Sequence, residues 1–310
     1  MPSRESVQIR SALLAEKNAP FAELSLAERR AGFEGMVERH VGQPIPLPEG
    51  THVQPVDAGG IPAEWVVPPH HSAESVLLYL HGGGYILGSP RSHRDLVARL
   101  SLAAGVRSLL IDYRLAPEHP FPAAVEDALA AYRWLLGAGV RPEQIVVGGD
   151  SAGGGLSLAL LLALRQEGLP MPAGAALISP WTDLPGELPS RAAKGDADPI
   201  FTSEALEGLG KAYPGATDPR HPQISPIHAD LRGLPALAIQ VGEDELLLDD
   251  SLVLAEHARA ADLAVELSVW PDMWHVFQIY AAAVPEAQRA IEELASFIRR
   301  RLGLGEAVVG

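Results

Sequence analysis

The sequence predicts an α/β fold in which a mostly parallel sheet of eight strands is covered by helices on both faces. From His52 onward, short apolar runs alternate with segments whose apolar residues recur at helical spacing, as is typical of such a sheet. The 310 residues can build one large core, and 47% hydrophobic with 20% charged residues fits a globular protein. The alternation stops between Pro180 and Leu231, where a long insertion is expected.

Residues 1–50 are predicted to form helices that precede the sheet. Helical segments are expected at 6–17 and 26–40, and Ser25 and Glu28 have the spacing of a capping box. The three prolines of residues 43–48 then stop the helix and form a stiff link.

Eight strands are expected beyond that link, and the first two or three are close enough in sequence to pair antiparallel. They span 53–56, 63–67, 76–80, 106–111, 145–147, 174–178, 236–241 and 265–269. Helices are predicted between them, most clearly after Pro122 and near the end of the chain, where apolar residues recur at helical spacing.

A serine lies in the turn between the strand at 145–147 and a helix-like apolar run. Residues 149–153 read Gly-Asp-Ser-Ala-Gly, the Gly-x-Ser-x-Gly pattern of a nucleophile elbow. The glycines are needed because the turn leaves no room for Cβ atoms beside Ser151. We therefore predict Ser151 to be a nucleophile at a helix N-terminus, where developing negative charge is favoured.

A glycine-rich loop follows the strand at 76–80, where residues 81–85 read His-Gly-Gly-Gly-Tyr. Acyl transfer needs backbone N–H donors for an oxyanion, and the loop offers those of Gly83 and Gly84 beside that of Ala152. A flexible loop and a phosphate cradle are the alternatives. The cradle is disfavoured because neither Gly-Lys-Ser/Thr nor Gly-x-Gly-x-x-Gly is present there.

These two motifs, with the segment Tyr-Arg-Leu-Ala-Pro-Glu-His-Pro-Phe-Pro-Ala-Ala at 113–124, resemble the bacterial hormone-sensitive-lipase-like family of α/β-hydrolase esterases. The resemblance runs from His52 to the C-terminus. It implies an α/β-hydrolase fold with a helical cap, and a cofactor-free carboxylesterase acting mostly on short acyl esters. The implied division is cap helices at 1–50, core at 51–180, cap insertion at 181–231 and core at 232–310.

A surplus of carboxylates follows the strand at 236–241. The family pattern there is Asp-Pro-Leu-x-Asp. Placed on Glu245, it finds Leu247 and Asp249, whereas on Asp244 it finds a leucine where the second Asp belongs. Glu245 is therefore the predicted acid, although Glu replaces the usual Asp and the proline is missing; Asp244 remains the alternative.

His275 is the predicted base because it follows the last strand, in the expected order Ser, acid, His. With Phe277 it meets the family's His-x-Phe pattern. Ser151 would attack the ester carbonyl while His275 removes its proton and Glu245 orients the imidazole. A lactone hydrolase or deacetylase using the same triad, and a catalytically dead receptor for small ligands, are the rival functions.

Walls of the substrate pocket are expected among apolar or aromatic residues near these motifs or in the insertion. The candidates are Tyr85, Ile200, Phe201, Tyr213, Trp274 and Val276, with Trp181 and Met273 as further neighbours. Ordinary core packing is the alternative for each of them, and Trp274, directly before the base, is the first to test.

Composition limits the partners. Twenty-four basic and 39 acidic residues give a net charge of −15, which opposes binding to nucleic acid or to an anionic membrane. The chain has no cysteine, and no histidine spacing indicates a metal site, so no metal or other cofactor is expected. Asp183, Asp196 and Asp198 are interpreted as solvated residues or turn formers instead of calcium ligands.

We expect a cytoplasmic protein, because the N-terminus leads into no apolar signal core. Its expected partner is a small ester substrate. The last strand should lie at a sheet edge, where it offers a surface for a homodimer. Glu266 in this strand and the flanking Asp262 and Asp272 oppose that pairing, because they would repel a second copy and keep the chain monomeric.

Overall fold

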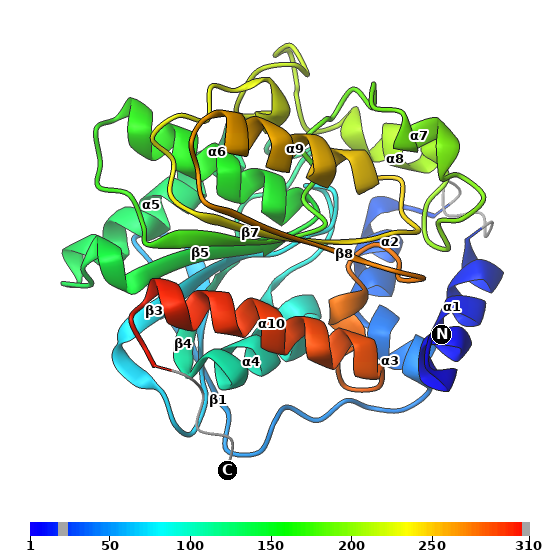
Figure 1. Cartoon of the computed structure of the whole chain (residues 1–310), viewed down its shortest axis with the longest axis horizontal. Helices are drawn as coiled ribbons and strands as arrows, with labels where there is room; N and C mark the ends of the chain where they lie inside the picture. Colours follow the sequence, from blue (N-terminus) through cyan, green and yellow to red (C-terminus); the bar gives the residue numbers. More distant parts are fainter. Residues whose placement is uncertain (18–23, 306–310) are drawn as a thin grey trace.

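A computed structural model describes residues 1–17 and 24–305 (Figure 1). Its sheet has eight strands in the order β1-β2-β4-β3-β5-β6-β7-β8. They are β1 His52–Asp57, β2 Pro62–Val67, β3 Ser72–Leu80, β4 Val106–Ile111, β5 Ile145–Asp150, β6 Gly174–Ile178, β7 Leu237–Gly242 and β8 Val265–Trp270. β2 runs antiparallel to β1 and β4, and the other neighbouring pairs are parallel. The predicted sheet, including the antiparallel first strands, is confirmed.

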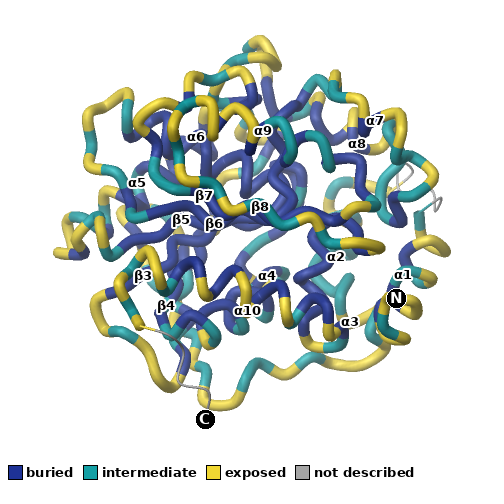
Figure 2. The backbone as a smooth tube through the Cα atoms, viewed as in Figure 1, coloured by how far each residue is buried: buried dark blue, intermediate teal, exposed yellow. Residues whose placement is uncertain are grey.

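Helices cover both faces of the sheet (Figure 1). On one face pack α5 Ala123–Gly137, α6 Ala152–Gln166 and α9 Leu248–Ala260; on the other pack α4 Pro90–Ala104 and α10 Pro285–Arg301. Figure 2 shows that the strands at the centre of the sheet are buried, and every residue of β5 is. Because β5 lies between β3 and β6, the turn that carries Ser151 leaves the middle of the sheet at its carboxyl edge.

The N-terminal segment contains α1 Arg4–Glu16, α2 Leu26–Glu34 and α3 Met36–Val41. The capping box is confirmed, since Ser25 and Glu28 exchange side chain-to-backbone hydrogen bonds. The single helix expected at 26–40 is instead broken at Gly35, which ends α2 and begins α3. Glycine favours such a break because it is a poor helix former. Residues 18–23 of the predicted first segment and 306–310 of the last lie outside the described residues.

The insertion between β6 and β7 contains α7 Ser190–Ala193, α8 Ser203–Gly210 and the 3₁₀ turn η3 Pro226–His228, and a further 3₁₀ turn, η2 Pro142–Gln144, precedes β5. α7 was not predicted, because four residues are too few to show a helical period.

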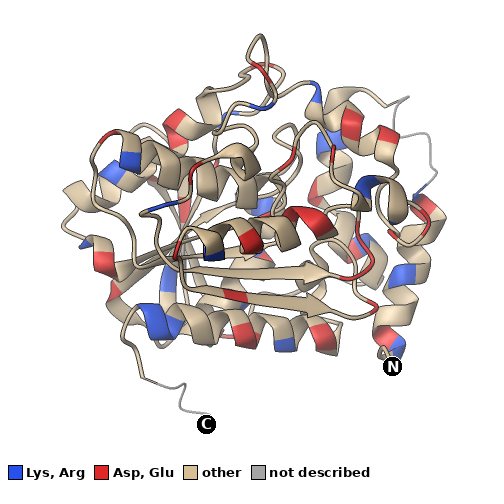
Figure 3. Ribbon diagram, turned by 45° about the horizontal axis from the view of Figure 1, so that its top comes forward, with Lys and Arg blue, Asp and Glu red and all other residues tan. Residues whose placement is uncertain are grey.

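Figure 3 shows charged residues spread over helices and loops, with few on the strands. In the described part of the chain, no helix has both the length and the apolar character needed to cross a bilayer.

Candidate active site

Ser151 occupies the turn between β5 and α6, with φ 52° and ψ −121°. Few residues adopt such angles without support from the surrounding structure. A Cβ on Gly153 would lie 2.0 Å from the Leu80 carbonyl oxygen, and one on Gly149 would lie 2.4 Å from that of Gly153. Only glycine therefore fits on either side, and the Ser151 side chain, 6% exposed, is held at the N-terminus of α6.

The structure brings His275 and Glu245 together. His275 Nδ1 lies 2.5 Å from Glu245 Oε2, and both side chains are buried. The other carboxylate oxygen, Oε1, accepts hydrogen bonds from the Gly242 N–H at 2.8 Å and from the Ser179 hydroxyl at 2.9 Å. Two hydrogen bonds thus fix one carboxylate oxygen of Glu245, and the other oxygen contacts the imidazole of His275.

Asp244, the alternative acid, forms no hydrogen bond or ion pair with His275 among the described residues. Its carboxylate pairs with Arg10 at 3.0 Å and lies 3.9 Å from Lys194 Nζ, and it is partly exposed. The two neighbouring carboxylates therefore have different surroundings, and the geometry favours Glu245 as the residue that orients the imidazole.

The surroundings of His275 suit a base. Burial would lower the pKa of the imidazole, but the carboxylates of Glu245, Asp198 and Asp150 outweigh burial and raise the pKa above its usual value. Nε2 is buried and has no hydrogen-bond partner among the described residues. In the same part of the chain no hydrogen bond joins Ser151 to His275; such bonds often tighten only when substrate binds.

Ser179, which no sequence motif predicts, links the loops that carry Ser151, Glu245 and His275. The Ser151 N–H donates to the Ile178 carbonyl at 2.9 Å. The next residue, Ser179, donates its hydroxyl to Glu245 and accepts the Val276 N–H at 3.2 Å. Ser179 directly follows the strand at 174–178, at the same sheet edge as Ser151. That position could have been used to predict its role.

The loop after β3 offers free backbone donors. Gly83 and Gly84 have φ of 117° and 63°, and a Cβ on Gly83 would lie 2.3 Å from the Leu87 carbonyl oxygen. Among the described residues, no hydrogen bond uses the N–H of Gly83, Gly84 or Ala152. Three unpaired N–H groups therefore remain at the sequence positions predicted to stabilise an oxyanion.

Asp150, buried beside Ser151, ties this loop to the elbow. Its Oδ1 accepts from the Gly82 N–H at 3.1 Å and the Tyr79 hydroxyl at 3.0 Å, and its Oδ2 lies 3.2 Å from His93 Nε2. Burial alone would raise the pKa of Asp150, but His93, Tyr79 and His81 together outweigh burial and lower the pKa. A charged Asp150 thus holds the glycine loop next to the serine turn.

The six predicted pocket residues have different surroundings in the structure. Tyr85 and Tyr213 stack with ring centroids 3.6 Å apart, and Phe201 meets the His275 ring edge-on at 5.3 Å. Trp274 is fully buried and packs against Tyr280 in the core between α4, α10 and the sheet. The remaining two are Val276, which donates its N–H to Ser179, and the half-buried Ile200.

The expected neighbours Trp181 and Met273 are both buried in the core. Two surface hollows, of about 260 Å³ beside Arg165 and about 400 Å³ beside Arg107, include no residue of the predicted active site.

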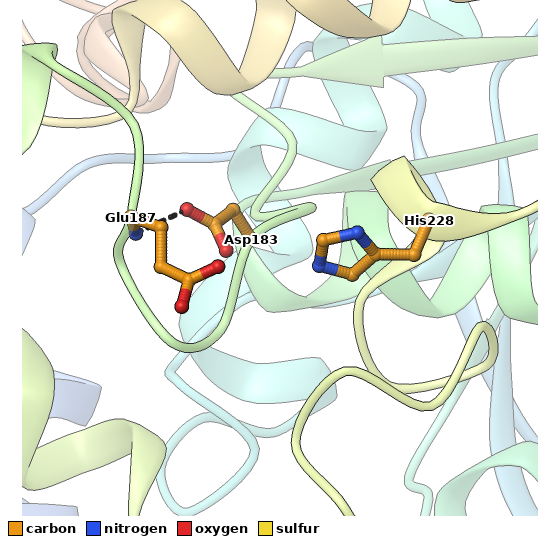
Figure 4. Close-up of side chains that lie close together, drawn as sticks. All are labelled: Asp183, Glu187 and His228. Atoms are coloured by element: carbon orange, nitrogen blue, oxygen red, sulfur yellow. Dashed lines mark hydrogen bonds between the residues drawn. The ribbon is translucent and has the colours of Figure 1, made fainter.

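One cluster could hold a cation: ligand atoms of Asp183, Glu187 and His228 lie within 4.8 Å of one another (Figure 4). However, the Glu187 carboxylate already pairs with Arg220. Asp183 Oδ2 accepts the N–H groups of Glu187 and Leu188 at 2.6 and 3.1 Å, as expected of a turn former. The cluster therefore has an arginine as its counter-charge. The alternative that Asp183 is solvated is wrong, because it is buried.

Comparison with known proteins gives a consistent result. A family model described as alpha/beta hydrolase fold matches residues 77–279. An acetyl-hydrolase of Streptomyces hygroscopicus is 48% identical over 81% of this chain and 83% of its own length. An esterase of Acinetobacter venetianus is 38% identical over 79% of this chain and 81% of its own length.

Solved structures agree. An esterase from the bacterial hormone-sensitive lipase family superposes with a TM-score of 0.93 at 41% identity, covering 98% of this chain and all of that one. An esterase crystal soaked with p-nitrophenyl butyrate gives a TM-score of 0.91 at 42% identity, covering 97% of this chain and 99% of that one.

Proposed function

The chain belongs to the α/β-hydrolase-fold family and to its bacterial hormone-sensitive-lipase branch, and we propose that it is a serine carboxylesterase for short- to medium-chain esters. Ser151, His275 and Glu245 are the proposed triad. The observation that carries this assignment is the buried contact of His275 Nδ1 with Glu245 Oε2, which leaves Nε2 unpaired. An unpaired, buried nitrogen on an oriented imidazole is what a general base requires.

In the proposed reaction, Ser151 Oγ attacks the ester carbonyl while His275 Nε2 takes its proton. The oxyanion is stabilised by the N–H groups of Gly83, Gly84 and Ala152. Nε2 then returns the proton to the leaving alcohol, which departs and leaves an acyl group on Ser151. Water, deprotonated at the same nitrogen, attacks this acyl-enzyme, and release of the acid restores Ser151.

The test of the nucleophile is Ser151→Ala, with Ser157→Ala as its matched control. Ser157 is a second buried serine, in the helix α6 that follows Ser151, and its hydroxyl donates to the Gly153 carbonyl. Ser151→Ala should lose about 10⁴-fold or more in kcat and all labelling by a fluorophosphonate, because no other group can form the acyl-enzyme. Ser157→Ala should keep both. Retention of a tenth of wild-type kcat by Ser151→Ala would refute the assignment.

We also propose that the N-terminal helices and residues 181–231 form a cap that limits acyl chain length. Lys17 and Arg10 of the N-terminal segment bind carbonyl groups of residues 195–198, which supports a joint unit. Relatives named acetyl-hydrolase, and a neighbour soaked with a butyrate ester, support small acyl groups. Nitrophenyl esters with acyl chains of about two to eight carbons should react best. A preference for emulsified long-chain triglyceride would contradict the cap.

We propose a cytoplasmic location, which cell fractionation would test.

We also propose a homodimer through β8. β8 is one of the two edge strands of the sheet and exposes Val269. Glu266 is paired with Arg300 at 2.7 Å, which reduces the repulsion that its charge would cause between two copies. Sedimentation at low and high salt tests the dimer: a particle of 32.9 kDa under both conditions would exclude it.

A further inference from the structure

Asp198 is a fully buried carboxylate between α7 and α8, and no sequence pattern predicts a role for it in the site. Its Oδ1 accepts the N–H groups of Ile200 at 2.7 Å and Phe201 at 3.0 Å, and its Oδ2 accepts the Leu246 N–H at 2.9 Å. It forms no salt bridge with a described residue. Three backbone donors therefore satisfy a carboxylate that would otherwise be costly to bury.

Both oxygens of Asp198 act on groups next to the proposed triad. Leu246, bound by Oδ2, directly follows Glu245 in the chain. Phe201, bound by Oδ1, places its ring edge-on against His275, with centroids 5.3 Å apart and planes at 63°. One carboxylate thus fixes both the peptide that follows the acid and the ring that contacts the base.

Helix α1 and the residue after it also bind the segment 195–198, which contains Asp198. Lys17 Nζ lies 2.6 Å from the carbonyl oxygens of both Gly195 and Asp198. Arg10 donates to the Ala197 carbonyl at 2.7 Å and pairs with Asp244 of the acid loop at 3.0 Å. The N-terminal helix is therefore joined to the acid loop both directly and through Asp198.

We propose that Asp198 is a positioning residue that couples residues 195–201 and helix α1 to the alignment of Glu245 and His275. This inference rests on the proposed esterase function. The described carboxylates that act on the His275 imidazole are Glu245, Asp198 and Asp150, and Asp198 contributes to its raised pKa. The charge of Asp198 thereby stabilises the imidazolium that forms while Ser151 attacks.

Asp198→Asn tests the coupling with little change in shape. The amide can accept either from Ile200 and Phe201 or from Leu246, but its NH₂ group then faces an N–H of the other set. We expect kcat to fall roughly 10- to 100-fold, because small misalignments of catalytic groups are costly. KM should stay within about threefold, since no substrate contact is removed. The pKa governing the acid limb of kcat/KM should fall, because one of the negative charges that raise the pKa of His275 is removed.

Asp127→Asn is the matched control. Asp127 is also a buried carboxylate that accepts a backbone N–H, from Arg114 at 2.8 Å, and it pairs with the Arg114 side chain. Among the described residues it forms no hydrogen bond with a residue of the proposed site. It should lower stability without moving the acid limb. Asp196 is an exposed carboxylate of residues 195–201, and Asp196→Asn controls for surface charge. It should leave kcat and the acid limb of kcat/KM unchanged.

Titration of the His275 imidazole by NMR, assigned with His275→Gln, gives a readout that needs no activity. A wild-type kcat and an unmoved imidazole pKa in Asp198→Asn would overturn the proposal while leaving the esterase function intact. A wild-type protein that hydrolyses no ester would instead refute the function, and the imidazole titration would still test the coupling.

If Asp198→Asn does not fold, Lys17→Met decides. It removes the bonds to Gly195 and Asp198 but keeps the carboxylate, and should lower kcat by roughly two- to fivefold. No change in kcat would count against the coupling.

Discussion

Replacing Glu245 by Gln tests the proposed acid through the hydrogen bonds around it. Oε1 accepts two hydrogen bonds, from the Gly242 N–H and the Ser179 hydroxyl, so the amide oxygen of Gln must take that place. The NH₂ group then occupies the position of Oε2 and donates to His275 Nδ1. The imidazole proton is forced onto Nε2, which can no longer accept a proton from Ser151.

The expected loss follows from this tautomer. The corresponding acid-to-amide change in a serine protease triad lowers kcat by about 10⁴-fold with the geometry intact. We expect a loss of roughly 10³- to 10⁴-fold here, or about 4 to 5.5 kcal/mol of transition-state stabilisation. Asp244→Asn should change kcat by less than about threefold, because its partly exposed pairs with Arg10 and Lys194 contribute little.

The assay is steady-state hydrolysis of p-nitrophenyl acetate and butyrate by both variants and wild type, with thermal unfolding as the check on folding. A Glu245→Gln protein that is folded and inactive beside an active Asp244→Asn protein is the expected pair of results. If Asp244→Asn is the inactive variant, the assignment of the acid is wrong by one residue and the contact of Glu245 with His275 is structural.

Three further outcomes are expected. The pKa of His275 is raised, so kcat/KM should decline as pH falls through a value above about 6.5, where the base is protonated, and a decline only below pH 6 would contradict this. Burial raises the pKa of Asp250 to about 7, so the folded protein should lose stability as pH rises from about 4 to 7 and this carboxyl loses its proton. Asp250→Asn should remove up to roughly 4 kcal/mol of that pH dependence of the unfolding free energy. An equal slope of unfolding free energy against pH in wild type and variant would refute the burial argument. Gly153→Ala should abolish activity and lower the melting temperature, because its Cβ would lie 2.0 Å from the Leu80 carbonyl oxygen, and a fully stable, active variant would show that the elbow relaxes.

Much of the site could be predicted because its signals are local. The glycines around Ser151 and those of the loop after β3 reflect steric limits set within a few residues. Glu245 and His275 follow strands whose carboxyl ends meet at one sheet edge, so their order along the chain predicts proximity. The break at Gly35 and the short helix α7 were missed because neither changes the apolar period over enough residues to be seen.

The roles of Ser179 and Asp198 could not be predicted in the same way. Ser179 bonds to Glu245 across 66 residues of sequence, and Asp198 bonds to Leu246 across 48. A serine or an aspartate in a polar loop forms turns far more often than long-range contacts, so the local pattern favours the ordinary interpretation. The exposure of Asp198 was misjudged for this reason: it is a turn former, but it is buried and not solvated.

The fold class, the turn that carries Ser151 and the glycine loop after β3 follow from the sequence alone, because strand and helix periods and steric limits at glycine act between near neighbours. Three other features depend on the folded chain: which of two adjacent carboxylates reaches His275, why its Nε2 is unpaired, and how Asp198 joins the N-terminal helix to the acid loop. Those outcomes depend on how loops distant in sequence pack at one edge of the sheet, where Glu245 contacts His275 and the adjacent Asp244 pairs with Arg10.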